Sequence, residues 1–142
     1  MQPTPSPSSA FRFSRPITVV ESHIDALNHV NNVQYVQWIQ DIAGWHWLTA
    51  YPEGEREHYI WVVLEHHVRY HKPALLGDEL TLTTWVGEMK GATSQRFTRI
   101  ERVADGSLLC EAETKWVMLD PQTQRPKRIE QSVAARMQGP VG

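Results

Sequence analysis

The stretch HIDALNHVNNVQY, residues 23–35, decides the fold of this chain. Residues 25–32 of this stretch hold a carboxylate, an imidazole and three side-chain amides, in Asp25, His29, Asn28, Asn31 and Asn32. Asparagine is a preferred N-cap, so either Asn31 or Asn32 can start a helix here. Polar groups at the positive end of a helix can polarise a carbonyl oxygen. The stretch therefore predicts a helix with a polar site at its start.

Apolar side chains recur at three- and four-residue spacing directly after this stretch, at Val33, Val36, Ile39, Ile42, Ala43 and Trp47. That spacing predicts one apolar face of an α-helix of about five turns. No proline interrupts the pattern before Pro52. The charged segment 51–58, which contains Pro52 and Gly54, is predicted to be a loop.

Strand-like runs lie on both sides of the predicted helix. Before it, Phe11–Ser22 alternates imperfectly, and Pro16 within it favours an edge strand or a bulge. After it, four apolar or β-branched runs predict strands at Ile60–His71, Leu80–Gly87, Ser94–Val103 and Leu108–Leu119. Turn residues separate them at 73–78, 90–91 and 105–106. We expect an α+β fold, with the last four strands in a meander and the helix covering one face.

The length of 142 residues predicts one domain. Residues 1–10 hold three prolines and three serines and are predicted to be a disordered leader. The domain is expected over residues 11–135. A polar tail begins at Pro121, and residues 136–142 are predicted to be flexible.

The composition is that of an ordinary globular protein, with 41% hydrophobic and 21% charged residues. The net charge of -2 and the lack of a basic stripe give no reason to expect nucleic acid as a partner. One cysteine, Cys110, excludes an internal disulfide and is expected to be inert core. No apolar run approaches the roughly 18 to 20 residues of a membrane span, and no apolar signal segment opens the chain, so we expect a cytoplasmic protein.

Three separated motifs carry a resemblance to a known family. Residues 23–35 resemble the Asp-x-Asp-x-x-Gly-His-Val-Asn-Asn-x-x-Tyr motif of the 4-hydroxybenzoyl-CoA thioesterase-like hotdog proteins. Val68–Leu80 is similar to the family's strand and turn with Pro-Ala and Gly-Asp. Trp116–Asp120, with Arg125 and Pro126, resembles its last strand. The resemblance covers about residues 13–130 and implies a hotdog fold, in which a five-stranded antiparallel sheet wraps around one long helix.

The resemblance implies an acyl-CoA thioesterase in which Asp25 acts as general base or as nucleophile. It implies that backbone N–H groups of about residues 29–31 hold the thioester oxygen, and that His29 positions the substrate. Further substrate-binding candidates at the start of the helix are Asn31, Asn32 and Tyr35. A second group lies in the region that often contacts CoA phosphates in the resembling proteins, and consists of Lys90, Thr93, Ser94 and Arg96. Asn31 and Asn32 can also act as turn and cap residues, and the second region can be an ordinary hairpin.

Two residues depart from the family motif. His23 replaces its first aspartate, and Asn28 replaces its glycine, although asparagine tolerates a left-handed backbone. The His-Val-Asn-Asn run is also similar to plant acyl-ACP thioesterases. An acyl-ACP thioesterase and a non-catalytic acyl-CoA-binding hotdog protein are therefore alternatives.

No cofactor or metal is expected. Glu65 and His67 share one face of a strand, but no cysteine cluster or helical His-Glu-x-x-His motif accompanies them. Hotdog proteins work as dimers or tetramers, so we expect a homodimer or homotetramer with the active cleft between two subunits. The expected partner is acyl-CoA, whose acyl chain would lie beside the helix near Trp38, Trp45 or Trp47; core packing is the alternative for each tryptophan.

Overall fold

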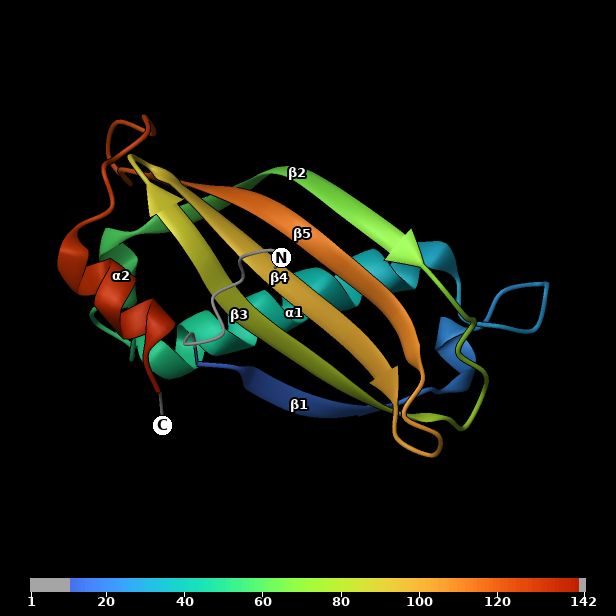
Figure 1. Cartoon of the computed structure of the whole chain (residues 1–142). Helices are drawn as coiled ribbons and strands as arrows, with labels where there is room; N and C mark the ends of the chain where they lie inside the picture. Colours follow the sequence, from blue (N-terminus) through green and yellow to red (C-terminus); the bar gives the residue numbers. More distant parts are fainter. Residues whose placement is uncertain (1–10, 141–142) are drawn as a thin grey trace, which may run out of the picture.

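The computed structural model describes residues 11–140 (Figure 1). The predicted leader, residues 1–10, lies outside the described part. The elements in chain order are β1 (Phe13–Thr18), the 3-10 turn η1 (Glu21–His23), α1 (Asn32–Ala50), the 3-10 turn η2 (Arg56–His58), β2 (Ile60–Tyr70), β3 (Glu79–Lys90), β4 (Thr93–Arg102), β5 (Leu108–Leu119) and α2 (Gln131–Gln138).

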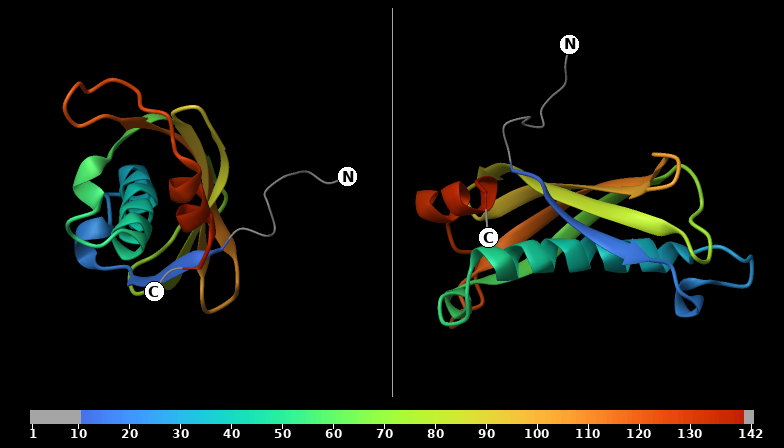
Figure 2. Two further views of the ribbon diagram at one scale, coloured as in Figure 1. Left: turned by 90° about the vertical axis from the view of Figure 1, so that its left-hand side faces the viewer. Right: turned by 90° about the horizontal axis from the view of Figure 1, so that it is seen from below.

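The five strands form one antiparallel sheet in the order β1-β3-β4-β5-β2. The predicted four-strand meander is wrong for β2, which pairs with β5, while β3, β4 and β5 form a meander. This order places β2 at the opposite edge from β1, so the sheet can curve around α1 (Figure 2). Pro16 lies in β1, an edge strand that pairs only with β3. Proline lacks a backbone N–H, and an edge strand tolerates this because one of its sides makes no hydrogen bonds to another strand of the sheet.

Helix α1 starts where the sequence predicts, because Asn31 acts as its N-cap. The Asn31 side chain accepts a hydrogen bond of 2.8 Å from the Val33 N–H. The buried face of α1 packs in the concave side of the sheet and consists of Tyr35, Trp38, Ile39, Ile42, Ala43, His46 and Ala50. A single long helix inside a curved five-stranded sheet is the predicted hotdog arrangement, which is confirmed.

A second helix, α2, was not predicted. Its polar sequence, QSVAARMQ, gave little periodic signal, but Val133 and Met137 are buried. These two side chains pack in a cluster with Ala50, Tyr51 and Val86, next to the C-terminal end of α1. Residues 136–138 of the predicted flexible tail belong to this helix, and residues 141–142 lie outside the described part.

Candidate functional site

The segment before α1 folds into a tight loop around Asp25. The Asp25 N–H donates to the carbonyl oxygen of His29 (3.1 Å), and the Asn28 N–H donates to the carbonyl oxygen of Asp25 (3.0 Å). One carboxylate oxygen of Asp25 accepts the Leu27 N–H at 2.9 Å. Within residues 11–140 the second carboxylate oxygen has no hydrogen-bond partner. The loop thus holds the Asp25 side chain in place and leaves one oxygen free for chemistry.

Asn28 occupies the left-handed position that the loop requires. Its φ is 66°, a conformation that costs most residues energy but is tolerated by asparagine and glycine. The replacement of the family's glycine by Asn28 therefore preserves the turn. The other departure, His23, accepts the Val20 N–H through Nδ1 at 3.0 Å and packs its ring against Trp38. His23 is a structural residue of this loop.

The backbone N–H groups at the start of α1 are only partly free. Val30 donates to the carbonyl oxygen of Ala74 (2.9 Å), and Asn31 donates to that of His23 (3.0 Å). Two of the three donors predicted over residues 29–31 are therefore used within the chain. In the described part of the protein the His29 N–H has no partner, and Asn32, the first helical residue, has no helical acceptor one turn earlier.

The turn over residues 73–78 buttresses this loop. Besides accepting from Val30, Ala74 donates its own N–H to the Tyr35 hydroxyl at 2.9 Å, in a fully buried contact. Tyr35 was predicted to bind substrate, but its hydroxyl is engaged by the backbone of this turn. The Pro-Ala part of the motif thus connects directly to the helix-start part, although some forty residues separate them.

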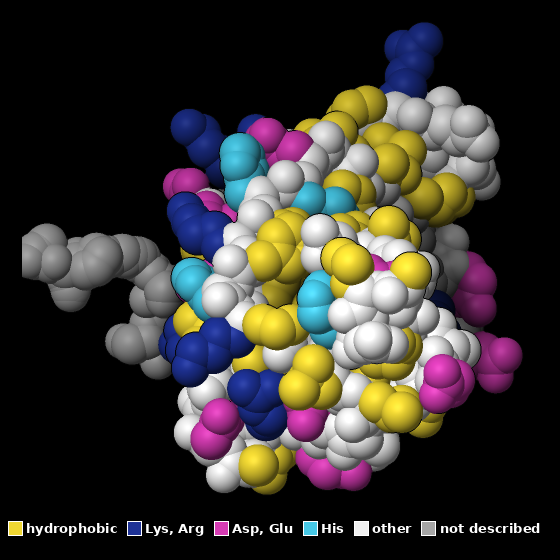
Figure 3. Space-filling model, turned by 90° about the vertical axis from the view of Figure 1, so that its right-hand side faces the viewer, with side chains coloured by type: hydrophobic (Ala, Val, Ile, Leu, Met, Phe, Trp, Pro, Cys, Tyr) yellow, Lys and Arg dark blue, Asp and Glu magenta, His cyan; other side chains and the backbone are white. Residues whose placement is uncertain are grey.

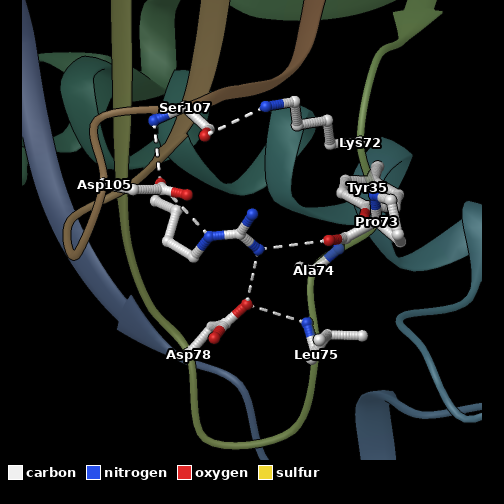
Figure 4. A network of polar contacts seen from close by, with 9 residues as sticks. Tyr35, Lys72, Pro73, Ala74, Leu75, Asp78, Asp105 and Ser107 are labelled. Atoms are coloured by element: carbon white, nitrogen blue, oxygen red, sulfur yellow. Dashed lines mark hydrogen bonds and ion pairs between the residues drawn. The ribbon is translucent and has the colours of Figure 1, made fainter.

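Arg102 and two carboxylates hold the turn in place (Figure 4). The Arg102 guanidinium donates to Asp78 (3.0 Å), to Asp105 (3.3 Å) and to the carbonyl oxygen of Pro73 (3.3 Å). Asp78 also accepts the Leu75 N–H at 2.9 Å. These bonds raise the pKa of Arg102, while the Ser107 N–H and Arg102 lower the pKa of Asp105 to about 2. The network therefore stays charged at neutral pH.

A surface pocket of about 230 Å³ lies beside the loop. It is lined by His29, Val30, Asn32, Tyr35, Tyr70, His71, Lys72 and Pro73. The predicted residues His29, Asn32 and Tyr35 are thus brought together, whereas Asp25 is not part of this lining. In Figure 3, which views this end of the molecule, histidine and apolar side chains alternate over the surface, with Lys and Arg along one flank.

The structure brings together only part of the predicted phosphate-binding group. Lys90, Thr93 and Ser94 line a groove outside the sheet, which also contains Lys115 and three glutamates, Glu65, Glu88 and Glu113. That charge balance does not favour phosphate oxygens. Glu65 and His67 contact each other there at 3.3 Å. In the part of the chain described, no group of three or more His, Cys, Asp or Glu side chains could hold a metal.

Arg96 does not line that groove. Arg96 and Ser94 are both buried and line a cavity of about 260 Å³ inside the sheet, beside the C-terminal half of α1. No sequence pattern indicates this orientation, because a strand with Ser94, Arg96 and Thr98 on one face is expected to turn that face to solvent. Cys110 is fully buried, and burial raises the pKa of its thiol to about 12, so it is not a nucleophile.

Comparison with known proteins assigns the family. The family model described as the Thioesterase-like superfamily matches residues 19–137, most of the chain. The chain belongs to the thioesterase-like superfamily. It is 35% identical over 134 residues to the acyl-CoA thioester hydrolase YbgC of Escherichia coli O6:H1, covering 87% of this chain and 93% of that one. It is 25% identical over 125 residues to the long-chain acyl-CoA thioesterase FadM of Escherichia coli K12, covering 82% and 89% of the two chains.

A solved structure agrees on the fold of this superfamily member. The structure of SAV2348 from Staphylococcus aureus, determined in complex with CoA, superposes with a TM-score of 0.80. The match covers 94% of this chain and 89% of that one at 22% identity. The resemblance to hotdog-fold thioesterases stated from the sequence motifs is therefore confirmed. Among the described helices, none is both long and apolar enough to cross a membrane.

Proposed function

We propose that this protein hydrolyses acyl-CoA thioesters to the free acid and CoA, with Asp25 as the catalytic carboxylate. The observation that carries the proposal is the Asp25 side chain, held through one oxygen and free at the other, next to unpaired backbone donors at the start of α1. The relatives YbgC, an acyl-CoA thioester hydrolase, and FadM, a long-chain acyl-CoA thioesterase, support the substrate class.

Asp25 would act in one of two ways. As a general base it takes a proton from water, whose oxygen adds to the thioester carbon while the CoA thiolate leaves. As a nucleophile its oxygen adds to the thioester carbon, the carbon–sulfur bond breaks and the CoA thiolate leaves; water then cleaves the resulting mixed anhydride to the free acid and Asp25. In both cases negative charge builds up on the thioester oxygen. The N–H groups of His29 and Asn32 are the donors left free to hold that oxygen, at the positive end of the helix.

The proposed active unit is a dimer with the cleft between two subunits. Support comes from β2, an edge strand with an unpaired side and with Val62, Leu64 and Tyr70 exposed. Further apolar side chains, Leu27, Val33, Leu75 and Leu76, are exposed around the helix start. Exposed apolar side chains in this number are typical of regions covered by a partner subunit or by an acyl chain.

The test is Asp25→Asn, assayed with a panel of acyl-CoA thioesters. The asparagine side chain can still accept the Leu27 N–H, so the loop should keep its shape. We expect kcat/KM to fall by about 100-fold or more, because positioned acid–base groups contribute about 100- to 10,000-fold. The matched control is Asp41→Asn in α1, where the half-buried Asp41 accepts a hydrogen bond from the Gln37 side chain at 2.8 Å; its activity should not change.

Two outcomes would contradict the proposal. Full turnover in the Asp25→Asn variant would remove Asp25 from the mechanism. No turnover of any thioester by the wild type, with acyl-CoA still bound, would favour the non-catalytic acyl-CoA-binding alternative.

A further inference from the structure

The cavity beside the C-terminal half of α1 has the features of a second ligand site. Its wall includes Met137 of α2, and Figure 1 shows α2 at the C-terminal end of α1, opposite the segment that precedes the helix. Gly44 in its wall is twelve residues along the helix from Asn32, which corresponds to about 18 Å. The packed side chains of Tyr35, Trp38, Ile39 and Ile42 fill the space between the two ends. The cavity is therefore separate, within one subunit, from the proposed thioesterase site.

Arg96 places a positive charge at this cavity without a negative partner. Its side chain is 6% exposed, and its Nη1 contacts His46 Nδ1 (3.0 Å) and Thr84 Oγ1 (3.1 Å). Over residues 11–140 no carboxylate lies within 4.0 Å of the guanidinium. Buried charges in proteins are normally paired, because burial without a counter-charge is costly. Burial lowers the pKa of Arg96 to about 10, so the group is still charged at neutral pH.

Two further donors of the cavity wall lack partners. The indole N–H groups of Trp61 and Trp116 are buried and make no hydrogen bond within the described part of the chain. Trp116 of β5 pairs across the sheet with Ser94 of β4. Ser94 lies two residues from Arg96, on the same face of β4. Trp116 and Arg96 therefore lie on neighbouring strands and share one face of the sheet. The wall contains no aspartate or glutamate. The residues that line the cavity thus include a cation and two indole N–H groups without a partner among the described residues, and no carboxylate.

The rest of the wall is apolar and aromatic, with Ala43, Trp47, Tyr59, Met89 and Met137. Such a wall favours an anion with an apolar body over phosphate or sulfate, whose hydration is too strong for these surroundings. The volume of about 260 Å³ equals that of about nine liquid water molecules, which suits a ligand of about nine or ten non-hydrogen atoms. Trp47, Tyr59, Trp61 and Met89 are only half-buried, so the cavity opens to the surface.

We propose that this cavity binds a small organic carboxylate, with its carboxylate on Arg96 and the indole N–H groups of Trp61 and Trp116, and its apolar body against Trp47 and Met137. Arg96 is suited to this role because a guanidinium pairs with a carboxylate through two parallel hydrogen bonds. Two of its nitrogens, Nε and Nη2, make no hydrogen bond to the described residues, which leaves them for such a ligand.

Phenylacetate is the test ligand, and phenylacetamide, which has the same shape and no charge, is its control. Binding is followed by the indole N–H signals in proton–nitrogen NMR spectra and by the thermal unfolding midpoint. We expect phenylacetate to shift the Trp61 and Trp116 signals saturably, to leave Trp38 unchanged, and to raise the midpoint. Phenylacetamide should bind at least about tenfold more weakly, since hydrogen bonds to charged groups are the strong ones.

Two variants and one control assign the contact. Arg96→Met should weaken phenylacetate binding at least about tenfold. Trp116→Phe keeps the ring and removes only the N–H, so it should weaken binding several-fold even if the arginine variant does not fold. Arg99→Met, on the opposite face of the same strand, should bind as the wild type does.

The proposal is overturned if no saturable shift occurs, if phenylacetamide binds equally well, or if the shifts fall on Trp38, near the Asp25 loop. The first result would mean that the cavity holds only water. Asp25→Asn should bind phenylacetate normally. A failure of the thioesterase mechanism is therefore distinguishable from a failure of this site.

Discussion

Asn28 shows how a single residue maintains the loop that holds Asp25. With φ at 66°, the position accepts asparagine or glycine at little cost. Asn28→Gly, which restores the family's residue, should leave the free energy of unfolding within about 0.5 kcal/mol of the wild type. Asn28→Val should lower it by about 1 to 2 kcal/mol, since a β-branched side chain is strained there. Urea unfolding measures both, and equal stability of the two variants would contradict the strain.

His46 makes the stability of the protein depend on pH. Burial and the neighbouring Arg96 lower its pKa to about 3 in the folded state, against 6.5 when unfolded. The unfolded chain therefore binds the extra proton between these values, so stability is lost as the pH falls from about 6.5 towards 3. In His46→Gln this loss should be smaller by up to about 1.4 kcal/mol per pH unit. Urea unfolding at pH 6.5 and pH 4 measures this loss of free energy of unfolding. The exposed His58→Gln variant is the control. If the free energy of unfolding changes equally with pH in both variants, His46 is not the residue responsible.

The connection between α1 and the turn over residues 73–78 acts at the scale of elements. The Tyr35 hydroxyl accepts a hydrogen bond from the buried Ala74 N–H. The carbonyl oxygen of Ala74 in turn accepts one from the N–H of Val30, beside the site. Tyr35→Phe leaves that N–H unpaired and should lower the free energy of unfolding by about 1 to 3 kcal/mol. Hydrogen exchange at the Ala74 and Val30 amides should accelerate with it.

Tyr70→Phe is the matched control for this contact. The Tyr70 side chain is exposed, and its hydroxyl makes a long hydrogen bond of 3.4 Å to the Asn32 carbonyl oxygen. A bond of this length is weak, so its loss should change the free energy of unfolding little. Equal destabilisation by both substitutions would mean that the Tyr35 hydrogen bond does not hold the turn.

Local signals predicted the elements, and distant contacts decided the rest. The start of α1 followed from Asn31, and the edge position of β1 followed from Pro16. The place of β2 beside β5 depends on pairing between segments far apart in the chain, which no local pattern specifies. The inward orientation of Arg96 was missed for a related reason: a polar strand face is buried only because its partners His46 and Thr84 come from α1 and β3.

At the scale of the whole molecule, we expect a second copy to pair with the edge strand β2. A strand with unpaired backbone groups on one side is a template for pairing with a second chain. Val62 is 41%, Leu64 54% and Tyr70 46% exposed along this strand, which are high values for large apolar side chains in a sheet. If two copies pair here, each would extend its sheet across the interface and bring the loop of one subunit next to its partner.

Leu64→Arg tests this assembly, since a charge on an edge strand opposes pairing. We expect the wild type to be a dimer or tetramer and the variant a monomer in analytical ultracentrifugation, with thioesterase kcat/KM reduced by at least about tenfold, because a cleft between subunits is lost with the dimer. Val103→Arg, on an exposed side chain after the end of β4, should change neither property. A wild type that is fully active as a monomer would show that the proposed site is complete within one chain, and that the apolar edge of β2 serves another partner.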